Sequence, residues 1–297
     1  MSTRNKILLG ILGFYIGSLI VVVAIFGFTR RDNEEFAPQN EFQLDTWIEL
    51  GPLDFNKAVM YLIIAALLTA GSMIFVANRM QARPNKVQTA VETLYTLMRD
   101  NITRGNMDDA MARKWFPFIG ALFLFIWYSN LIGYIPLPTN THEPFHVFGL
   151  EIPSFAIYAA TANIAIPLTL ALIVFIAYNA EGVRAKGVGG YLKSLVPAGV
   201  TGPMAVFVFV LEFLSNIMRL LSLSVRLFAN ILAGHLIILF MSGGLAVLLG
   251  LEALGVFTLP FGVLLFAFEV GLVATLQAFI FATLTAIYLG GAVAEHH

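Results

Sequence analysis

The chain has 297 residues, of which 59% are hydrophobic and 12% are charged, and its mean hydropathy is +0.84. Soluble domains are about 45–50% apolar and about 25% charged, so the composition indicates a polytopic membrane protein. The net charge of −1 and the lack of a basic run exclude nucleic-acid binding. Because the chain has no cysteine, disulfides, thiolate metal sites and cysteine nucleophiles are excluded as well.

Apolar runs predict membrane-spanning helices at 7–28, 58–78, 116–137, 155–178, 204–247 and 258–291. Such runs do not alternate as barrel strands do, so we expect an all-α membrane protein with about six hydrophobic helices. The first run also resembles an export signal, but its length and the lack of an A-x-A-like site favour a retained helix. We therefore expect an N-terminal anchor helix with an extracytoplasmic segment over 1–57, and a membrane domain over 58–297.

The hydrophilic segments between the spans predict the topology. Residues 86–112 carry apolar positions near helical spacing with charges between them, which indicates an amphipathic helix on the cytoplasmic face. Residues 138–154 contain no Lys or Arg and are expected to form an outer loop. With both termini in the cytoplasm, twelve basic residues lie inside: Arg4, Lys6, Arg79, Arg83, Lys86, Arg99, Arg104, Arg113, Lys114, Arg184, Lys186 and Lys193. Only Arg30, Arg31 and Lys57 lie outside, which favours this orientation.

The last two apolar runs are longer than a bilayer requires. The fifth would be about 66 Å long if helical throughout, more than twice the roughly 30 Å of the hydrocarbon core. The sixth is expected to begin near Pro260, a favoured first-turn residue. Glycines between the two runs supply a turn, so the pattern predicts a long, strongly tilted helical hairpin.

A polar stripe follows the fifth run. At about 100° per residue, five polar residues fall within about 40° of Arg226: Glu212, Ser215, Arg219, Ser222 and Asn230. A charge near the bilayer centre costs about 2.5–3.5 kcal/mol, so this stripe must face protein or water. Arg226 lies too deep in the run to reach the interface, which favours a functional role for it. Arg219 and Glu212 are equally compatible with snorkelling or pairing near the cytoplasmic end.

A second set of ionisable residues lies beyond the stripe. His235 follows Arg226 by nine residues, about 180° round the helix and about 13 Å further along. Glu269 is the only acidic residue of the last run, and Gln277 follows it by eight residues. A histidine and a carboxylate in opposing arms of a hairpin are candidates for a proton relay. The alternative is a neutral histidine bonded to a protonated carboxyl group that only joins the helices.

No enzyme motif accompanies these residues. The five histidines are scattered or terminal, and HExxH, GxSxG and Walker-type sequences are absent. We therefore expect no metal site, no cofactor and no reaction chemistry on this chain itself. An intramembrane enzyme would need a nucleophile and base or a metal-ligand set, and none converges in the sequence. A stand-alone ion channel or secondary transporter stays open as an alternative, because the charged stripe would also suit a permeation path.

Several segments together resemble subunit a of F-type ATP synthase. They are Ser222-Leu-Ser-Val-Arg226-Leu-Phe-Ala-Asn230 with the following Ile-Leu-Ala-Gly-His235, Leu276-Gln277-Ala278-Phe279-Ile280-Phe281, Asn130-Leu-Ile-Gly133-Tyr-Ile-Pro136 and the tail Glu295-His296-His297. The resemblance implies a membrane stator beside a rotating ring of c subunits, together with the subunit b peripheral stalk and the remaining synthase subunits, which hold the nucleotide sites. It implies H⁺ as the translocated ion, with Na⁺ not excluded. The bacterial plasma (inner) membrane is expected, with an organelle's energy-transducing membrane as the alternative.

The same resemblance implies a role for each polar residue. Arg226 matches the family's essential arginine, and Asn230 and Gln277 would line the ring-facing surface and an access path. Ser222, Arg219 and Glu212 match polar positions of the cytoplasmic half-channel. His235 matches a position whose partner usually lies seven residues before the glutamine, where this chain has Val270. Since one residue turns a helical direction by about 100°, Glu269 can pair with His235 only if the helix is locally bulged.

Overall fold

The computed structural model describes residues 46–50, 53–81, 85–147, 150–197, 199–244 and 252–294, with a few isolated positions before residue 46. In these ranges five helical stretches are long and apolar enough to cross a membrane: Lys57–Arg79, Asp109–Ile132, Ala165–Ser194, Pro203–Ser242 and Thr258–Val293. The expected all-α membrane fold is therefore confirmed. The expected first span, 7–28, lies for the most part outside the described residues and stays a prediction.

The chain divides into two compact units. The larger comprises residues 46–135, 159–232 and 273–297, and the smaller comprises residues up to 45, 136–158 and 233–272. The helix α6 (Pro203–Leu239) begins in the larger unit and ends in the smaller, and the π-helical segment η5 (Glu269–Val273) lies at the second crossing.

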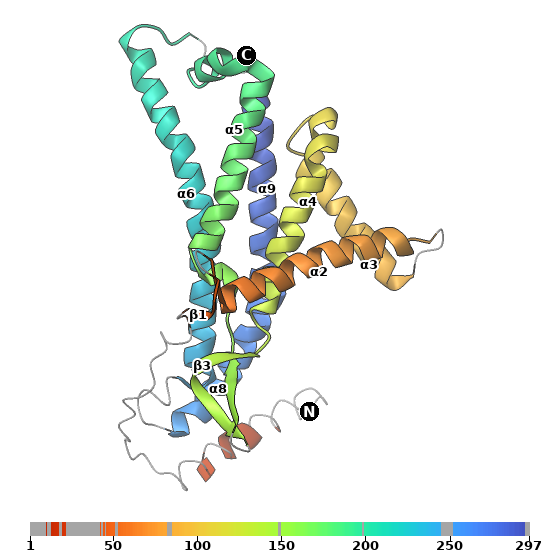
Figure 1. Cartoon of the computed structure of the whole chain (residues 1–297), viewed down its shortest axis with the longest axis vertical. Helices are drawn as coiled ribbons and strands as arrows, with labels where there is room; N and C mark the ends of the chain where they lie inside the picture. The colour runs from red at the N-terminus through yellow and green to blue at the C-terminus, as the bar shows by residue number, and fades with distance from the viewer. Residues whose placement is uncertain are drawn as a thin grey trace. The chain divides into compact units, whose positions relative to one another are not determined.

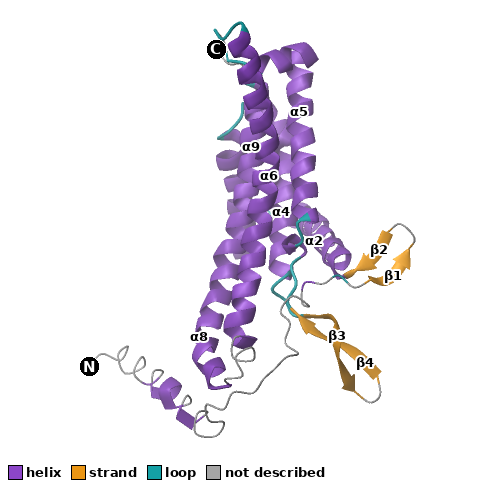
Figure 2. Cartoon of the chain, turned by 90° about the vertical axis from the view of Figure 1, so that its left-hand side faces the viewer, coloured by secondary structure: helices purple, strands orange, loops and turns teal. Residues whose placement is uncertain are grey.

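The core of the larger unit is a group of packed helices. Helices α4 (Asp109–Ile132) and α5 (Ala165–Ser194) both pack against α9 (Ala274–Val293), and α2 (Lys57–Arg79) packs against α4, as Figures 1 and 2 show. Four alanines spaced four residues apart on α9 have 0% exposure: Ala274, Ala278, Ala282 and Ala286. Small residues at this spacing form one helix face and allow neighbouring backbones to approach closely.

Side-chain caps begin two of the helices. A short hairpin of β1 (Thr46–Leu50) and β2 (Leu53–Asn56) leads into α2, and the Asn56 side chain accepts a hydrogen bond from the Val59 amide at 3.1 Å. The Asn85 side chain accepts one from the Gln88 amide at 2.8 Å and begins α3 (Lys86–Thr96). Such caps satisfy amides that have no partner within the helix.

The amphipathic helix expected over 86–112 is shorter than predicted. Helix α3 continues as the π-helical η2 (Leu97–Arg104) and ends there, and a separate helix, α4, begins at Asp109. Arg104 joins the two segments, with its guanidinium 3.2 Å from a carboxylate oxygen of Asp100 and 3.2 Å from one of Asp109. The hydrogen bond from Arg99 holds the pKa of Asp100 below its ordinary value.

Helix α5 lies later in the chain than its apolar run predicts. The run ends at 178, but the helix continues through Glu181, whose buried carboxylate pairs with Lys114 of α4. The helical backbone is interrupted at Gly187, where φ is 72°, and a second helical piece runs on to Ser194. A Cβ at Gly182 would fall against the Tyr191 ring and 3.2 Å from the Ala292 carbonyl oxygen. A partner 67 residues away in sequence thus keeps a charged residue inside the helix.

The smaller unit contains a helical turn and a β-hairpin. Strands β3 (Leu137–Val147) and β4 (Leu150–Ala156) pair antiparallel within the expected outer loop, a feature that the hydropathy pattern did not predict. Helix α8 (Glu252–Phe268) packs on the π-helical η4 (Phe240–Gly244). A Cβ at Gly262 would lie 3.1 Å from the backbone of Met241 and Ser242, so glycine permits this approach.

The expected helix start at Pro260 is wrong. Helix α8 begins at Glu252 and contains Pro260 in its interior. Proline removes one amide and clashes with the preceding turn, but apolar membrane helices tolerate it where neighbouring groups satisfy the freed carbonyl.

Candidate functional site

The polar stripe lies on one uninterrupted helix. Ser222, Arg226 and Asn230 of α6 are all exposed, together with the apolar Val225 and Ala229 between them. The Arg226 guanidinium donates to the Ser222 hydroxyl at 3.5 Å, a long bond one helical turn away. A permanent cation therefore lies on an open face of an apolar helix, where a bilayer would make it unfavourable unless water or an anion reached it.

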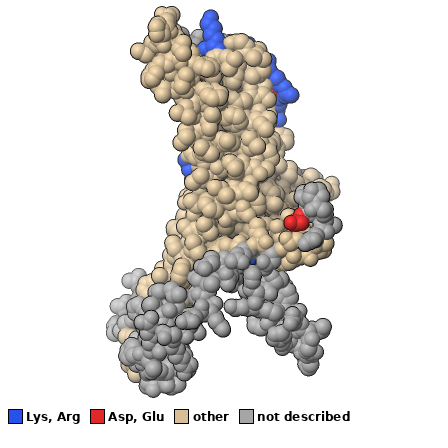
Figure 3. Space-filling view, turned by 60° about the vertical axis from the view of Figure 1, so that its left-hand side comes forward, with Lys and Arg blue, Asp and Glu red and all other residues tan. Residues whose placement is uncertain are grey.

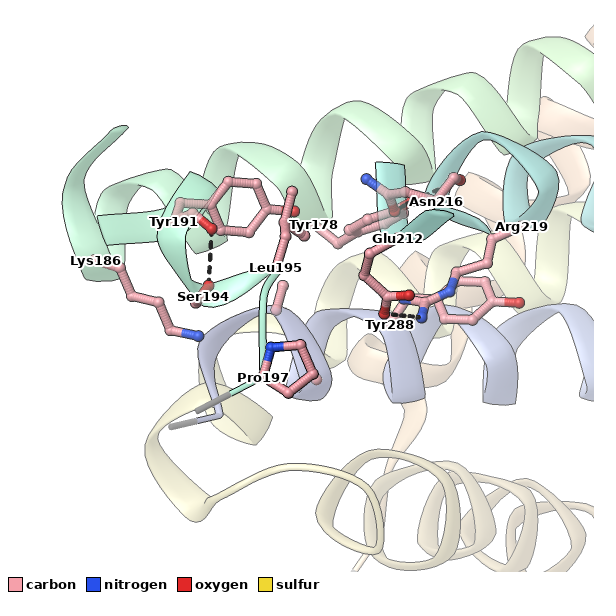
Figure 4. A pocket seen from close by; sticks show the side chains of 12 residues that line it. Tyr178, Lys186, Tyr191, Ser194, Leu195, Pro197, Glu212, Asn216, Arg219 and Tyr288 are labelled. Carbon is pink, nitrogen blue, oxygen red and sulfur yellow. Dashed lines mark hydrogen bonds and ion pairs between the residues drawn. The ribbon is translucent and has the colours of Figure 1, made fainter. Parts of the chain in front are cut away.

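A cavity of about 380 Å³ lies among α5, α6 and α9, and Arg219 and Glu212 are among the residues that line it (Figure 4). Its lining includes Lys186, Tyr191, Ser194, Glu212, Asn216, Arg219 and Tyr288. The guanidinium of Arg219 lies 3.7 Å from the Glu212 carboxylate and 5.7 Å from the centre of the Tyr288 ring. Both members of this ion pair are almost half exposed, so they line the cavity with charge rather than closing it.

A network of polar side chains joins α5 to α6 beside this cavity. The Tyr178 hydroxyl donates to Asn216 Oδ1 at 2.6 Å, and Asn216 Nδ2 donates to Asn179 Oδ1 at 3.0 Å. The Tyr191 hydroxyl donates to the same Asn179 oxygen at 2.8 Å. None of these four residues was predicted from the sequence as part of a site. The adjacent Tyr178 and Asn179 at the end of an apolar run were the available signal.

Charge is distributed unevenly over the face shown in Figure 3. Lysine and arginine side chains gather at its upper end, while the middle is almost uncharged. Near the C-terminal end of α5, Lys186 donates to the Ala294 carbonyl oxygen at 2.7 Å. An uncharged middle beside a basic end is the distribution that a membrane-spanning segment presents to lipid and to its polar interface.

In the smaller unit the Glu269 carboxyl group meets the end of α6. The place that a Cβ would take at Gly234 is filled by the Glu269 carboxyl group, next to His235 in sequence. Both ionisable side chains are buried, with His235 3% exposed and Glu269 9% exposed. Glycine at 234 is therefore what lets the carboxyl group reach the backbone beside the histidine.

The π-helical segment η5 supplies the local bulge that this approach requires. It spans Glu269–Val273, and π-helical bonds run from i to i+5, so the segment absorbs about one extra residue. Eight residues that include one such extra residue advance like seven of an ordinary helix, for which helix geometry gives a difference of about 20° in direction between the first and the last. Gln277 is 6% exposed on α9, whereas Arg226 lies on the open face of α6.

A smaller cavity of about 160 Å³ adjoins the histidine. It is lined by Phe42, Phe155, Ile157, His235, Ile238, Leu239 and Ser242. Most of this lining is apolar, so His235 and Ser242 are the side chains in it that can bind water or a proton.

A family model described as ATP synthase A chain matches residues 59–290. The chain belongs to the ATP synthase A chain family. It is similar to ATP synthase subunit a of Rubrobacter xylanophilus, with 36% identity over 80% of this chain and 83% of the relative. The corresponding proteins of Rhizobium rhizogenes and Pelagibacter ubique are 34% and 32% identical, over 83% and 88% of this chain and 92% and 98% of theirs.

Family membership and the five apolar helical stretches together establish an integral multi-pass membrane protein. The matched residues include the whole polar stripe, with Arg219 and Glu212 of the larger cavity, and the π-helical segment η5. In this member of the ATP synthase A chain family, the ionisable residues that the sequence singled out lie on the open α6 face, around the larger cavity, and in the buried His235 and Glu269 region.

Proposed function

We propose that this chain is the proton-translocating stator subunit in the membrane sector of an F-type ATP synthase. The observation that carries the proposal is Arg226, a permanent cation on the open face of a membrane-spanning helix. The face around it is formed by small and apolar residues such as Ala229 and Val225. Such a surface suits a second helix that carries a buried carboxylate, and the ring of c subunits supplies such helices.

In this mechanism Arg226 acts on each ring carboxyl group as it arrives. The guanidinium stays charged across the physiological pH range, so it stabilises the carboxylate and favours release of its proton to water. Because the guanidinium does not release its own proton and its positive charge repels others, it also blocks direct leakage between the two access paths. Protons then cross only by travelling with the ring, and rotation follows. Asn230 lies one turn from Arg226 on the same face and would contact the ring beside it.

Two access paths are assigned to the two cavities. The larger cavity, with Glu212 and Arg219, would form the cytoplasmic half-channel together with Ser222. The smaller cavity and the Glu269 carboxyl group near His235 would belong to the opposite half-channel, with Gln277 further along the same helix face. We also propose that both termini lie in the cytoplasm, which the distribution of Lys and Arg supports, and that the membrane is a bacterial plasma membrane. The partners of the chain are the c-ring, subunit b and the other synthase subunits.

Coupled ATP synthesis in the assembled enzyme tests the role of Arg226. We expect Arg226→Ala to abolish proton-driven ATP synthesis, since no cation remains to stabilise the ring carboxylate. Val87→Ala is the matched control, because Val87 is 70% exposed on α3, outside this face, and its truncation should leave the synthesis rate unchanged. Coupled synthesis in the Arg226→Ala enzyme at the control rate would refute the proposal.

A further inference from the structure

Two side chains of α4 hold α9 directly after the π-helical segment. The Asn130 amide donates to the Ala274 carbonyl oxygen at 3.2 Å, and the Trp127 indole donates to the Thr275 hydroxyl at 3.0 Å. Ala274 and Thr275 are the first two residues of α9, immediately beyond η5. We call Trp127 and Asn130 the register anchor.

Asn130 is itself fixed in place. Its carbonyl oxygen accepts a hydrogen bond from the Thr161 hydroxyl at 2.8 Å, and both side chains have 0% exposure. One turn later, the Cβ position of Gly133 is filled by Ala159, so the backbones approach closely there. Because the oxygen of the buried amide is already bonded, its nitrogen must donate to Ala274 or lose a hydrogen bond without compensation.

An extra residue in a helix needs such an anchor. In a uniform apolar helix the i to i+5 bonds can form at many positions, so local sequence fixes the bulge weakly. If the bulge moved beyond Gln277, the angle between Glu269 and Gln277 would change by about 100°. A hydrogen bond to a backbone carbonyl and one to a side chain at the first two residues of α9 oppose that movement.

We propose that Trp127 and Asn130 are positioning residues that confine the extra residue of the last helix to Glu269–Val273 and so keep Gln277 on the same face as Glu269. The inference rests on the proposed function, because it assigns a purpose to the alignment of these two groups. It also makes a separate prediction: substitutions in the register anchor lower proton pumping only while the extra residue is present.

A double-mutant cycle in the assembled synthase tests this prediction. Deletion of Gly271 removes one residue of η5 at an exposed position, where a Cβ would meet no atom within 4 Å apart from the adjoining residues and the backbone of its own helix. The deletion leaves the ordinary spacing of seven between Glu269 and Gln277. ATP-driven proton pumping is then measured in membrane vesicles, normalised to the amount of assembled subunit, with and without Asn130→Ala or the milder Trp127→Phe.

We expect the anchor variants to lower pumping about tenfold in the natural chain, as misplacement of a reacting group does. After deletion of Gly271, the same variants should lower it by no more than about twofold, a coupling that independent sites would not give. Ser129→Ala is the matched control, because the buried Ser129 hydroxyl has no hydrogen-bond partner. Any decrease in pumping that it causes should be the same with and without the Gly271 deletion.

If Asn130→Ala lowered pumping equally with and without the Gly271 deletion, the inference would be overturned. A residue that acts only through packing would have the same effect whether or not the last helix contains its extra residue. Pumping abolished by deletion of Gly271, and also by deletion of Val273 as a second variant, would overturn it too. Arg226→Ala in the same assay separates the two proposals. Pumping that persists in that variant refutes the stator function, whatever the cycle shows.

Discussion

At the scale of single residues, Gly234 and Gly271 are two helical glycines with opposite surroundings. The Cβ position of Gly234 is filled by the Glu269 carboxyl group, whereas that of Gly271 is open. We expect Gly234→Ala to displace Glu269 and to lower proton pumping about tenfold or more, because an added methyl group cannot share the space. Pumping assays with purified synthase in vesicles measure the effect.

Gly271→Ala serves as the control for this substitution. Both changes add one methyl group to a helix, and alanine is favoured over glycine there by about 1 kcal/mol. The control should therefore retain the natural pumping rate. A Gly234→Ala enzyme as active as the Gly271→Ala enzyme would show that the position of the carboxyl group is unimportant.

At the scale of the elements, α6 is joined to α5 beside the larger cavity by the Tyr178, Asn179 and Asn216 side chains. Tyr178→Phe removes the hydroxyl that donates to Asn216 at 2.6 Å. We expect the stability of the folded subunit to fall by about 1–3 kcal/mol, since the buried Asn216 oxygen loses its hydrogen-bond donor. The midpoint of heat-induced aggregation of subunit a from the detergent-purified enzyme measures the loss.

Tyr95→Phe is the comparison for this variant, because Tyr95 is 44% exposed on the surface helix α3. Its midpoint should match that of the natural enzyme. If the two phenylalanine variants had the same midpoint, the network would not be what stabilises the contact between α5 and α6.

Sequence patterns predicted those elements whose ends are set by residues close to them in the sequence. The run 58–78 nearly matches α2, because Asn56 caps its start and Arg79 ends its apolar stretch. The extension of α5 through Glu181 depended on Lys114, a partner distant in sequence. The position of the bulge in η5 likewise depends on the register anchor in another helix. Hydropathy carries no information on either contact, and it also missed the β3–β4 hairpin.

At the scale of the whole molecule, the open α6 face implies an assembly. The chain has no cysteine, so Asn230→Cys introduces a single thiol on that face. We expect it to form a disulfide with cysteines placed near the buried carboxylate of subunit c in native membranes. Leu227→Cys should not, because Leu227 is 1% exposed. Yields on gels of unreduced membranes measure the difference.

The opposite result would favour a self-contained channel. In that case neither thiol would cross-link to subunit c, and the purified chain alone would conduct protons across liposomes. The absence of such conduction, together with cross-linking at Asn230→Cys, would place the ion path at the junction between two proteins rather than inside one.

The π-helical segment η5 also affects how relatives are to be compared. A turn that absorbs one residue makes a membrane helix tolerant of insertion and deletion, an event usually assumed to be confined to loops. Where a relative has an ionisable residue seven positions before its glutamine, an alignment without gaps in this helix would set Val270 against that residue and leave Glu269 unmatched. Placing the gap within Glu269–Val273 restores the correspondence. A comparison of this chain with its relatives therefore has to allow a gap inside the last helix.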